Sequence, residues 1–360
     1  MASFDPTNVN LNDVDPAQVI CYLNASGNDY NGQLGARISA IFVILFCSTA
    51  ATFFPVVAQR IPSLKIPVYV YLFARYFGTG VIIATAFIHL LDPAYGEIGP
   101  NTCVGMTGNW AQYSWVPAIV LASVVVIFLM DFGAELYVES KYGIVKHDER
   151  GVIVQDVHLH DHHHITPAAC PTKETPQTLP SQKIACNEQE SDSVVAEKSF
   201  RQQIAAFLIL EFGVMFHSVI IGLNLGVVGD EFATLYPVLV FHQSFEGLGI
   251  GARMSAIPFK RNSYLPWLLC LAYGLTTPIS IAIGLGVRNT YNPNSNTANI
   301  VSGVLDSISA GILIYTGLVE LLARDFLFDP DRTSDRRRLA FMIVCILLGA
   351  GLMALLGKWA

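Results

Sequence analysis

Long apolar runs are the feature of this 360-residue sequence that most limits its fold. A helix needs about 20 mostly apolar residues to cross the hydrocarbon core of a bilayer. Eight segments meet this requirement, at approximately residues 36–59, 68–91, 114–138, 203–228, 233–256, 264–287, 298–323 and 339–357. The strands of a membrane barrel are excluded, because the runs are too long and do not alternate with a period of two. The sequence therefore predicts an all-α polytopic membrane protein with eight transmembrane helices.

The composition supports a membrane protein and excludes other classes of chain. Charged residues make up 14% of the sequence and hydrophobic residues 52%, with a mean hydropathy of +0.47. An ordinary soluble protein contains roughly 25% charged residues. A disordered chain, a disulfide-rich mini-protein and an ordinary soluble enzyme are therefore excluded. The net charge of −7, without a basic face, also argues against a nucleic-acid partner.

The positions of lysine and arginine predict the orientation of the spans. When the segments between spans are assigned alternately to two sides, only three of the 21 lysines and arginines fall on one side: Arg37, Arg288 and Lys358. Cytosolic loops carry the excess of positive charge, so both termini are expected to be extracellular. The outer side carries acids that include Asp92 and Glu97, which would raise the local concentration of cations.

Two features of the expected outer side bear on this orientation. Asn24-Ala25-Ser26 is a sequon for N-glycosylation, which occurs outside the cytosol. Cys21 and Cys103 lie in two polar segments, and they could pair if both face an oxidising compartment.

The chain is predicted to have four parts. Residues 1–35 form an extracellular N-terminal tail, residues 36–138 the first three helices, and residues 203–360 helices four to eight with the metal transport site. Residues 139–202, between the third and fourth helices, are rich in Pro, Ser, Gln, Glu and Lys and lack helical periodicity. This composition predicts a long, flexible, His-rich cytosolic loop.

Three polar side chains stand out within the apolar spans. His217 and His242 lie near the middle of two adjacent spans, and Glu246 follows His242 by four residues, on the same helix face. A glutamate at the centre of a span costs about 2.5–3.5 kcal/mol on insertion scales. Since no lysine or arginine lies at a comparable depth, a bound divalent cation is the natural partner of this carboxylate.

Two imidazoles and a carboxylate suit Zn²⁺, although Fe²⁺, Mn²⁺, Co²⁺ and Cd²⁺ accept the same ligands. Ser218 and Gln243 adjoin the two histidines and are candidates for weak ligands or for groups that orient the ligands. The alternative is structural: an intramembrane histidine often serves as a hydrogen-bond partner between helices.

Other polar residues are candidates for the path to and from this site. His89 and Asp92, at the outer end of the second span, are candidate metal-access residues; the alternative for His89 is a helix cap. Candidates for metal exit are Asp131, Glu135, Glu211 and Glu320, although an acid at a helix end is usually just solvated.

The long loop contains a histidine cluster that is a second candidate metal site. Imidazoles on a flexible chain bind zinc readily, so the cluster could hold exiting metal or sense a cytosolic excess. Incidental metal binding is the alternative. Lys183 and Lys198 offer attachment points for ubiquitination machinery that would remove the protein. The clustered histidines are His158, His160, His162, His163 and His164.

Glycines crowd the same helices as the central histidines. Gly222 and Gly226, and likewise Gly247 and Gly251, form small-xxx-small patterns that allow close helix packing. Such packing is needed to bring His217 near His242 and Glu246, although packing alone would also explain the glycines.

Two stretches carry a family resemblance. His217-Ser-Val-Ile-Ile-Gly-Leu-Asn-Leu-Gly226 and His242-Gln-Ser-Phe-Glu-Gly-Leu-Gly-Ile-Gly-Ala-Arg253 together resemble the ZIP (Zrt/Irt-like) family of zinc and iron permeases, in its plant and fungal branch. The similarity covers about residues 35–360. It implies eight spans, both ends outside, a His-rich loop between the third and fourth spans, and movement of divalent metal into the cytosol. The family's metal-binding positions fall on His217, His242 and Glu246.

The sequence also departs from that family pattern. Some members bind two adjacent metals through a bridging acid four residues after the fourth-span histidine, where this chain has Ile221. Acids or other ligands at further positions are replaced by Ser218, Gln243 and Thr277, and the second-span ligand position by Ile82. These replacements predict one central site and not two.

We therefore expect a plasma-membrane uptake transporter for a divalent metal, foremost Zn²⁺, which is its transported substrate and not the cofactor of an enzyme. The expected partners are the lipid bilayer and divalent metal ions, with a homodimer as a candidate assembly. Alternatives are an Fe²⁺ or Mn²⁺ transporter of the same family, a zinc receptor that does not transport, and an intramembrane zinc hydrolase. The hydrolase is disfavoured, because the sequence contains no His-Glu-x-x-His motif.

Overall fold

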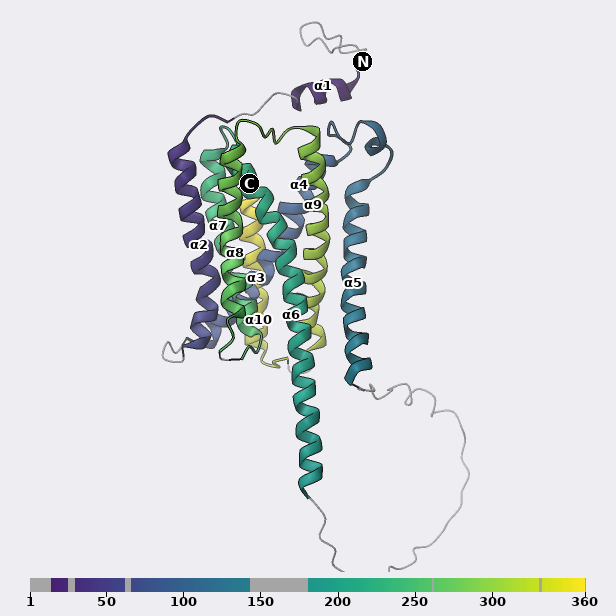
Figure 1. Cartoon of the computed structure of the whole chain (residues 1–360), viewed down its shortest axis with the longest axis vertical. Coiled ribbons are helices and arrows are strands. Elements are labelled where there is room, and N and C mark those ends of the chain that lie inside the picture. The colour runs from purple at the N-terminus through teal and green to yellow at the C-terminus, as the bar shows by residue number, and fades with distance from the viewer. Residues whose placement is uncertain are drawn as a thin grey trace, which may run out of the picture. The chain divides into compact units, whose positions relative to one another are not determined.

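The computed structural model describes residues 14–24, 30–61, 66–142, 181–260, 262–329 and 332–359. Every regular element in these ranges is a helix, and no strand occurs in them. The elements are α1 (Pro16–Asn24), α2 (Leu34–Arg60), α3 (Val68–Ala84), η2 (Thr85–Leu91), α4 (Asp92–Ile98), η3 (Gly108–Gln112), α5 (Trp115–Tyr142), α6 (Ser181–Val227), α7 (Phe232–Ala256), α8 (Leu265–Val287), α9 (Asn296–Tyr315), η5 (Thr316–Phe328) and α10 (Arg336–Leu356) (Figure 1).

The helices divide between two compact units. Residues 1–130 with 203–360 make up the first unit, and residues 131–202 make up the second. The first unit contains all of α7 and the part of α6 from Gln203 onward, which carry the central histidines and Glu246. The architecture below is that of the first unit.

Seven helices of the described chain are long and apolar enough to cross a membrane. This confirms the predicted all-helical, polytopic membrane protein. The fifth predicted span coincides with α7, which has 25 residues but falls outside this set. His242, Gln243, Glu246 and several glycines lie in α7 and lower its mean hydropathy. An eighth span therefore stays a prediction. The seven helices are Leu34–Arg60, Val68–Ile98, Trp115–Tyr137, Gln203–Val227, Leu265–Val287, Asn296–Phe328 and Arg336–Leu356.

The expected loop over residues 139–202 is wrong in its last part, because helix α6 already begins at Ser181. No glycine or proline occurs between Ser181 and Gly213, and this segment is rich in the good helix formers Ala, Glu, Gln and Lys. The span that follows therefore extends the helix backward into polar sequence. The histidine cluster at 158–164 lies outside the described residues.

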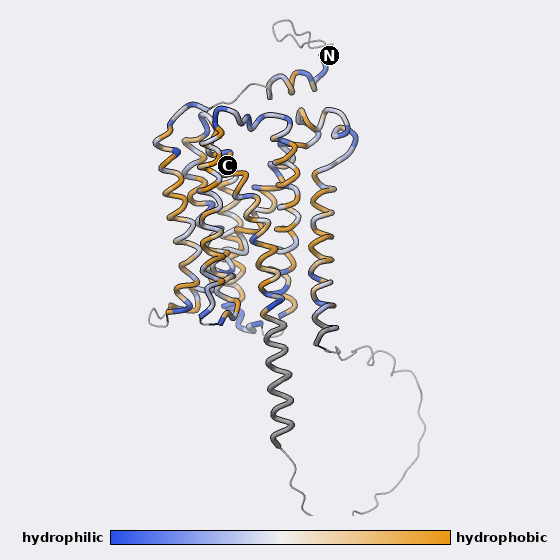
Figure 2. Tube along the Cα trace, viewed as in Figure 1, coloured by the Kyte–Doolittle hydropathy of each residue, from blue (hydrophilic) through white to orange (hydrophobic). Residues whose placement is uncertain are grey.

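Large apolar side chains on the outside of the bundle fit a lipid environment. Phe42 and Phe46 of α2 are 65% and 74% exposed, and Leu347 of α10 is 66% exposed. Apolar residues, drawn in orange, occur through most of the bundle (Figure 2). Inside the bundle, α2, α6, α7 and α8 share one apolar cluster that includes Ala40, Leu225 and Ile281. Apolar residues thus face both the core and the surroundings, as expected for helices within a membrane.

Glycine lets two pairs of helices approach closely. A Cβ added to Gly78 of α3 would lie 2.1 Å from the Cα of Gly249 of α7. A Cβ at Gly226 of α6 would lie 2.8 Å from the Cα of Gly284 of α8. Both distances are too short for any side chain, so glycine is required at these crossings.

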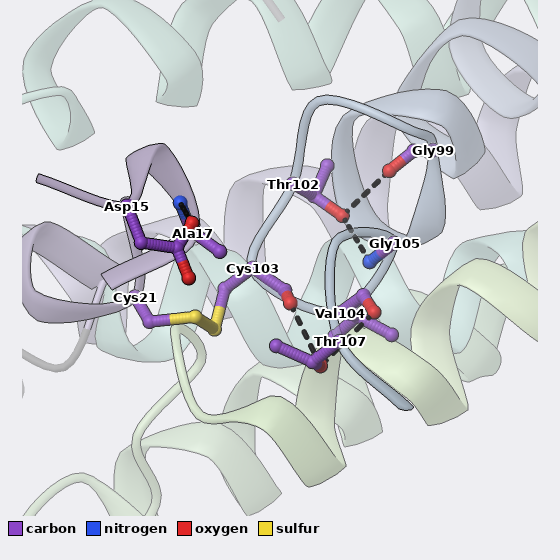
Figure 3. The surroundings of a disulfide bond; sticks show 9 residues. All are labelled: Asp15, Ala17, Cys21, Gly99, Thr102, Cys103, Val104, Gly105 and Thr107. Carbon is purple, nitrogen blue, oxygen red and sulfur yellow. Dashed lines mark hydrogen bonds between the residues drawn. A yellow bond between two sulfur atoms is a disulfide. The ribbon is translucent and has the colours of Figure 1, made fainter. Parts of the chain in front are cut away.

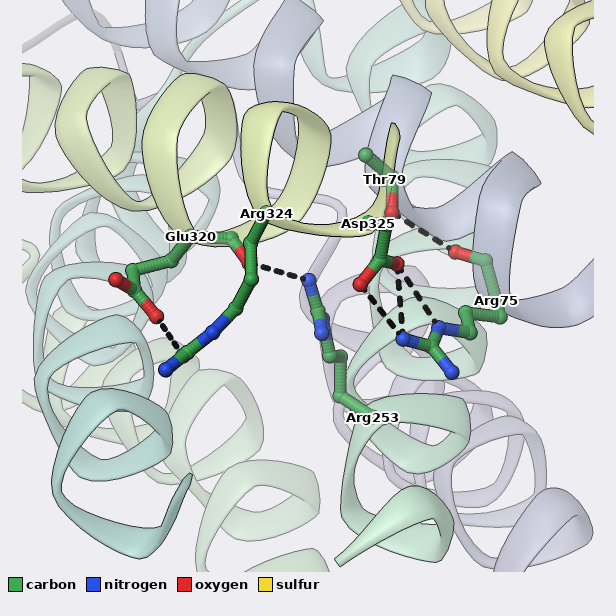
Figure 4. A network of polar contacts seen from close by, with 6 residues as sticks. All are labelled: Arg75, Thr79, Arg253, Glu320, Arg324 and Asp325. Atoms are coloured by element: carbon green, nitrogen blue, oxygen red, sulfur yellow. Dashed lines mark hydrogen bonds and ion pairs between the residues drawn. The ribbon is translucent and has the colours of Figure 1, made fainter. Parts of the chain in front are cut away.

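The two ends of the bundle differ in their chemistry. At one end, the disulfide end, Cys21 of α1 is bonded to Cys103 in the segment after α4 (Figure 3). The candidate pairing of these cysteines is thereby confirmed. At the opposite end, the basic end, Arg75 of α3 donates to both carboxylate oxygens of Asp325 of η5, with the shortest distance 2.8 Å. The half-buried Arg253 of α7 donates to the Glu320 carbonyl there (Figure 4).

Candidate functional site

A cavity of about 1100 Å³ enters the bundle from the disulfide end. Tyr30, Asp230 and Trp359 line its mouth, and His217 and His242 line its inner part. The segment just before α2 and the segment after α10 therefore lie beside the same opening. The cavity gives the two central histidines a route to one side of the bundle.

The two central histidines face each other from α6 and α7. Their Nε2 atoms are 3.3 Å apart, and the side chains are 1% and 2% exposed. Two nitrogens that each lie about 2.0–2.1 Å from a tetrahedral Zn²⁺ are separated by roughly 3.3 Å. The imidazole pair is therefore already spaced for two corners of a zinc site.

Glu246 lies beside this pair, at more than the distance of a metal-bridged contact. Its Oε2 atom is 4.0 Å from Nε2 of His242, and it accepts a hydrogen bond from the Tyr273 hydroxyl at 3.3 Å. The same hydroxyl lies 3.1 Å from both Oε1 and the carbonyl oxygen of Gln243. Among the described residues, no three His, Cys, Asp or Glu side chains already form a metal-binding group. A shift of the Glu246 carboxylate would be needed to complete one.

The centre holds more buried polar atoms than it has protein partners. Buried polar atoms are normally hydrogen-bonded, so each exception calls for a partner from outside the chain. A cation and its water would supply such partners to a set of this kind. At the centre, the buried atoms without a hydrogen-bond partner among the described residues include Nδ1 of His217, Oγ of Ser218, Nε2 of Gln243, Oε1 of Glu246 and Oγ1 of Thr277.

His89 lies closer to the centre than its expected position at the outer end of a span. It is 6% exposed, and its ring centroid is 4.7 Å from that of His242, in an edge-to-face arrangement. Its Nε2 lies 3.1 Å from the carbonyl oxygen of Met353, which can only accept. Nε2 therefore carries the proton, and only Nδ1 is available as a ligand atom. The π-helical turn η2 carries His89, and π-turns are frequent at functional sites.

The remaining predicted site residues are spread along the molecule. Asp92 is exposed and lines the cavity. Glu211 is 2% exposed, and both of its carboxylate oxygens lack a hydrogen-bond partner within the described residues. It precedes His217 by six residues, or about 9 Å along the helix, toward the basic end. Asp131 and Glu135 are half-buried on α5, in the second unit.

The glycines of the two small-xxx-small patterns do not pack the two histidine helices against each other, as was expected. Gly247 and Gly251 of α7 pack against Thr52 of α2, and Gly222 of α6 packs against Ser280 of α8. The glycines therefore position each histidine helix against a third helix. The spacing of His217 and His242 results indirectly from these two contacts.

Sequence reasoning missed two residues at this site. Tyr273 is fully buried and is the hydrogen-bond donor to Glu246. Asp306 of α9 lines the cavity and is 3% exposed. A carboxylate ten residues into an apolar span is a signal that could have found Asp306. Nothing distinguishes Tyr273 in the sequence from an ordinary apolar neighbour.

The fold and the site define a polytopic helical membrane protein. Its buried polar centre lies at the inner end of a cavity that opens to one side. Residues 34–357 match the model of the ZIP zinc transporter family. The chain belongs to this family, which confirms the predicted resemblance. It is therefore a transporter and not an enzyme, and zinc is its substrate.

Similar proteins come from fungi and plants. Zinc-regulated transporter 1 of Saccharomyces cerevisiae is 56% identical over 99% of this chain and 97% of its own length. Zinc-regulated transporter 1 of Schizosaccharomyces pombe is 40% identical over 98% of this chain and 92% of its own length. Zinc transporter 9 of rice, Oryza sativa, is 32% identical over 94% of this chain and 93% of its own length.

Proposed function

We propose that this protein takes up zinc across the plasma membrane, from the disulfide end to the basic end, through a site formed by His217, His242 and Glu246. The observation that carries the proposal is the pair of Nε2 atoms 3.3 Å apart at the inner end of a cavity. A doubly charged ion at this position balances the buried Glu246 carboxylate, for which the described residues provide no ion pair with lysine or arginine.

The orientation is supported by two independent features. Disulfides persist in oxidising compartments, which puts the Cys21–Cys103 end outside the cytosol. The positive-inside rule puts the basic end in the cytosol. With α7 as an eighth span, whose polar residues face the interior of the bundle, both termini are extracellular. The cavity then opens to the outside, as uptake requires.

Binding at the centre needs only a small rearrangement. The two imidazoles supply two ligands at the spacing they already have, and Glu246 closes the 4.0 Å gap to become the third. The Tyr273 hydroxyl donates to Oε2 of Glu246 and lies between this carboxylate and Gln243, so it keeps the carboxylate beside the histidines when metal binds. Nδ1 of His89, Ser218 or water completes the tetrahedral set.

Release toward the cytosol passes the second buried carboxylate, Glu211, which is one and a half turns from His217. Asp131 and Glu135 are candidates for the later part of this route. The residues that line the cavity lie at the centre and toward the disulfide end. Transfer of metal to the basic end therefore requires a movement of the helices, which favours a carrier over an open pore.

A transport assay tests the three central residues. Cells that express Glu246→Gln or His217→Ala should lose uptake of radioactive zinc at a surface expression equal to that of wild type. Glu231→Gln, the same charge change at an exposed position of the cavity mouth, serves as the matched control. Uptake by both central variants at the wild-type rate would rule the site out.

A flux assay separates transport from the rival functions. Purified protein in proteoliposomes should carry zinc into the vesicles, whereas a receptor or an intramembrane hydrolase would bind zinc without net entry into the lumen. Competition by Fe²⁺ and Mn²⁺ in the same assay measures the preference among divalent metals.

The histidine cluster of the cytosolic loop is proposed to regulate the amount of transporter. Replacement of all five histidines from His158 to His164 by serine should leave the rate of zinc uptake unchanged and should slow the zinc-triggered, ubiquitin-dependent removal of the protein. Removal at the wild-type rate would leave only incidental metal binding by the loop.

A further inference from the structure

Two carboxylates in the outer cavity are not used by the central site. Asp306 of α9 is 3% exposed, and its Oδ1 atom is buried without a hydrogen-bond partner in the described part of the chain. Glu97, at the end of α4, likewise has a buried Oε2 without a partner there. Both residues line the same cavity as His217 and His242. Buried acceptors aimed into an open cavity are available to a ligand that enters it.

A close helix contact brings the two carboxylates together. Gly303 of α9 lies against α4, where an added Cβ would be 2.8 Å from Cγ2 of Ile98 and 3.2 Å from Cβ of Glu97. Asp306 follows Gly303 by three residues and so lies on the same face of α9. Packing of α9 against α4 at this glycine therefore places the Glu97 and Asp306 side chains on facing surfaces of the two helices.

Within the described ranges, neither Glu97 nor Asp306 forms an ion pair with a lysine or arginine. Lys358 lines the same cavity, but its ammonium lies over the ring of Trp359. The field of Glu97 reaches Tyr291, in the segment after α8, where burial and, after it, this carboxylate raise the pKa of the phenol. Two oxygen-bearing anions without a counter-charge favour a divalent cation over a monovalent one, since the attraction scales with the charge of the ion.

We propose that Glu97 and Asp306 form a divalent-cation site in the outer cavity, separate from the His217, His242 and Glu246 site. The carboxylate oxygens hold an ion that keeps part of its water. The ion then moves along the cavity to the histidines, which exchange the remaining water for nitrogen ligands. The outer site therefore raises the occupancy of the cavity at low external metal concentration.

Direct binding tests this proposal independently of the proposed transport site. Mn²⁺ is the probe, because it prefers oxygen ligands and is detected by electron paramagnetic resonance. The full chain is purified with Glu246→Gln and with the five loop histidines replaced by serine. We expect this protein to bind one Mn²⁺, and the further changes Glu97→Gln and Asp306→Asn to abolish that binding. Adding Glu231→Gln instead should leave it unchanged.

Unchanged Mn²⁺ binding after both Glu97→Gln and Asp306→Asn would overturn the proposal. Asp306→Glu keeps the charge and should keep the ion. If the double variant does not fold, Glu97→Gln alone decides, and it should weaken Mn²⁺ binding about tenfold, which corresponds to 1.4 kcal/mol. Because the protein already lacks Glu246, failure of the central site to transport zinc would not alter this result.

Uptake kinetics provide a second measurement, which rests on the proposed function. Asp306→Asn should raise the zinc concentration for half-maximal uptake about tenfold and leave the maximal rate near that of wild type, since saturating zinc bypasses the outer site. A lower maximal rate with unchanged half-saturation would contradict a capture role. It would indicate that Asp306 acts in the translocation step.

Discussion

Carboxylates occur both at the centre of the bundle and at its basic end, but the two regions differ in whether these carboxylates are paired with arginine. At the basic end, Asp325 is paired with Arg75, and Glu320 is paired with Arg324 (Figure 4). At the centre and in the cavity, Glu211, Glu246 and Asp306 form no ion pair with lysine or arginine within the described chain, and each has an oxygen without a hydrogen-bond partner. The paired acids of the basic end fit a structural role, whereas the acids of the centre and the cavity fit the proposed binding of a cation.

The largest expected effect is the loss of zinc uptake, without loss of stability, when Glu246 at the centre is changed. Glu246→Gln should lower zinc uptake at least ~100-fold, because removal of a direct ligand exceeds the 10–100-fold loss typical of a supporting residue. The same change should leave thermal stability in detergent unchanged or higher, because it removes an uncompensated buried charge. Uptake and the midpoint of thermal aggregation are measured on the same variant. A large loss of stability would show that Glu246 is a structural residue.

The fold could be predicted from the sequence further than the site could. Apolar runs specify where helices cross, because burial in lipid demands about 20 apolar residues whatever the neighbours. The His217, His242 and Glu246 group was visible because each polar residue interrupts such a run. The position of His89 was not predicted, since the π-turn η2 and the contact with Met353 arise from tertiary packing. Tyr273 was missed for the same reason: only the crossing of α7 and α8 makes it a partner of Glu246.

A change to a carboxylate at the basic end should lower stability more than it lowers zinc uptake. Asp325→Asn leaves Arg75 without its bidentate partner and should destabilise the protein by about 2–3 kcal/mol. This is less than for a fully buried pair, because the Arg75 side chain is 34% exposed. The midpoint of thermal aggregation should fall, and zinc uptake per folded molecule should stay within about twofold of wild type. An unchanged midpoint together with lost uptake would reverse the assignment of the two regions.

Because the charges at the centre do not pair, packing must hold that region together. Gly249→Ala would put a Cβ 2.7 Å from the Cα of Gly78 and should destabilise the protein by about 2 kcal/mol. Gly286→Ala is the matched control, because nothing lies within 4 Å of its added Cβ, and it should be neutral or stabilise α8 by up to about 1 kcal/mol. The thermal midpoints of the two variants should therefore move in different directions. Equal midpoints would show that the crossing of α3 and α7 is not a tight constraint.

The smallest expected effect concerns the hydrogen bond that Glu246 receives from Tyr273. Tyr273→Phe removes the hydroxyl that lies 3.3 Å from the carboxylate, so Glu246 loses the group that orients it toward the histidines. Zinc affinity should fall about tenfold, the lower limit for loss of a residue that supports a metal ligand. The half-saturating zinc concentration for uptake measures this change, and Tyr264→Phe, at an 85% exposed tyrosine just before α8, is the control. If Tyr273→Phe instead binds zinc more tightly, the hydroxyl competes with the metal for Glu246 and does not present the carboxylate to it.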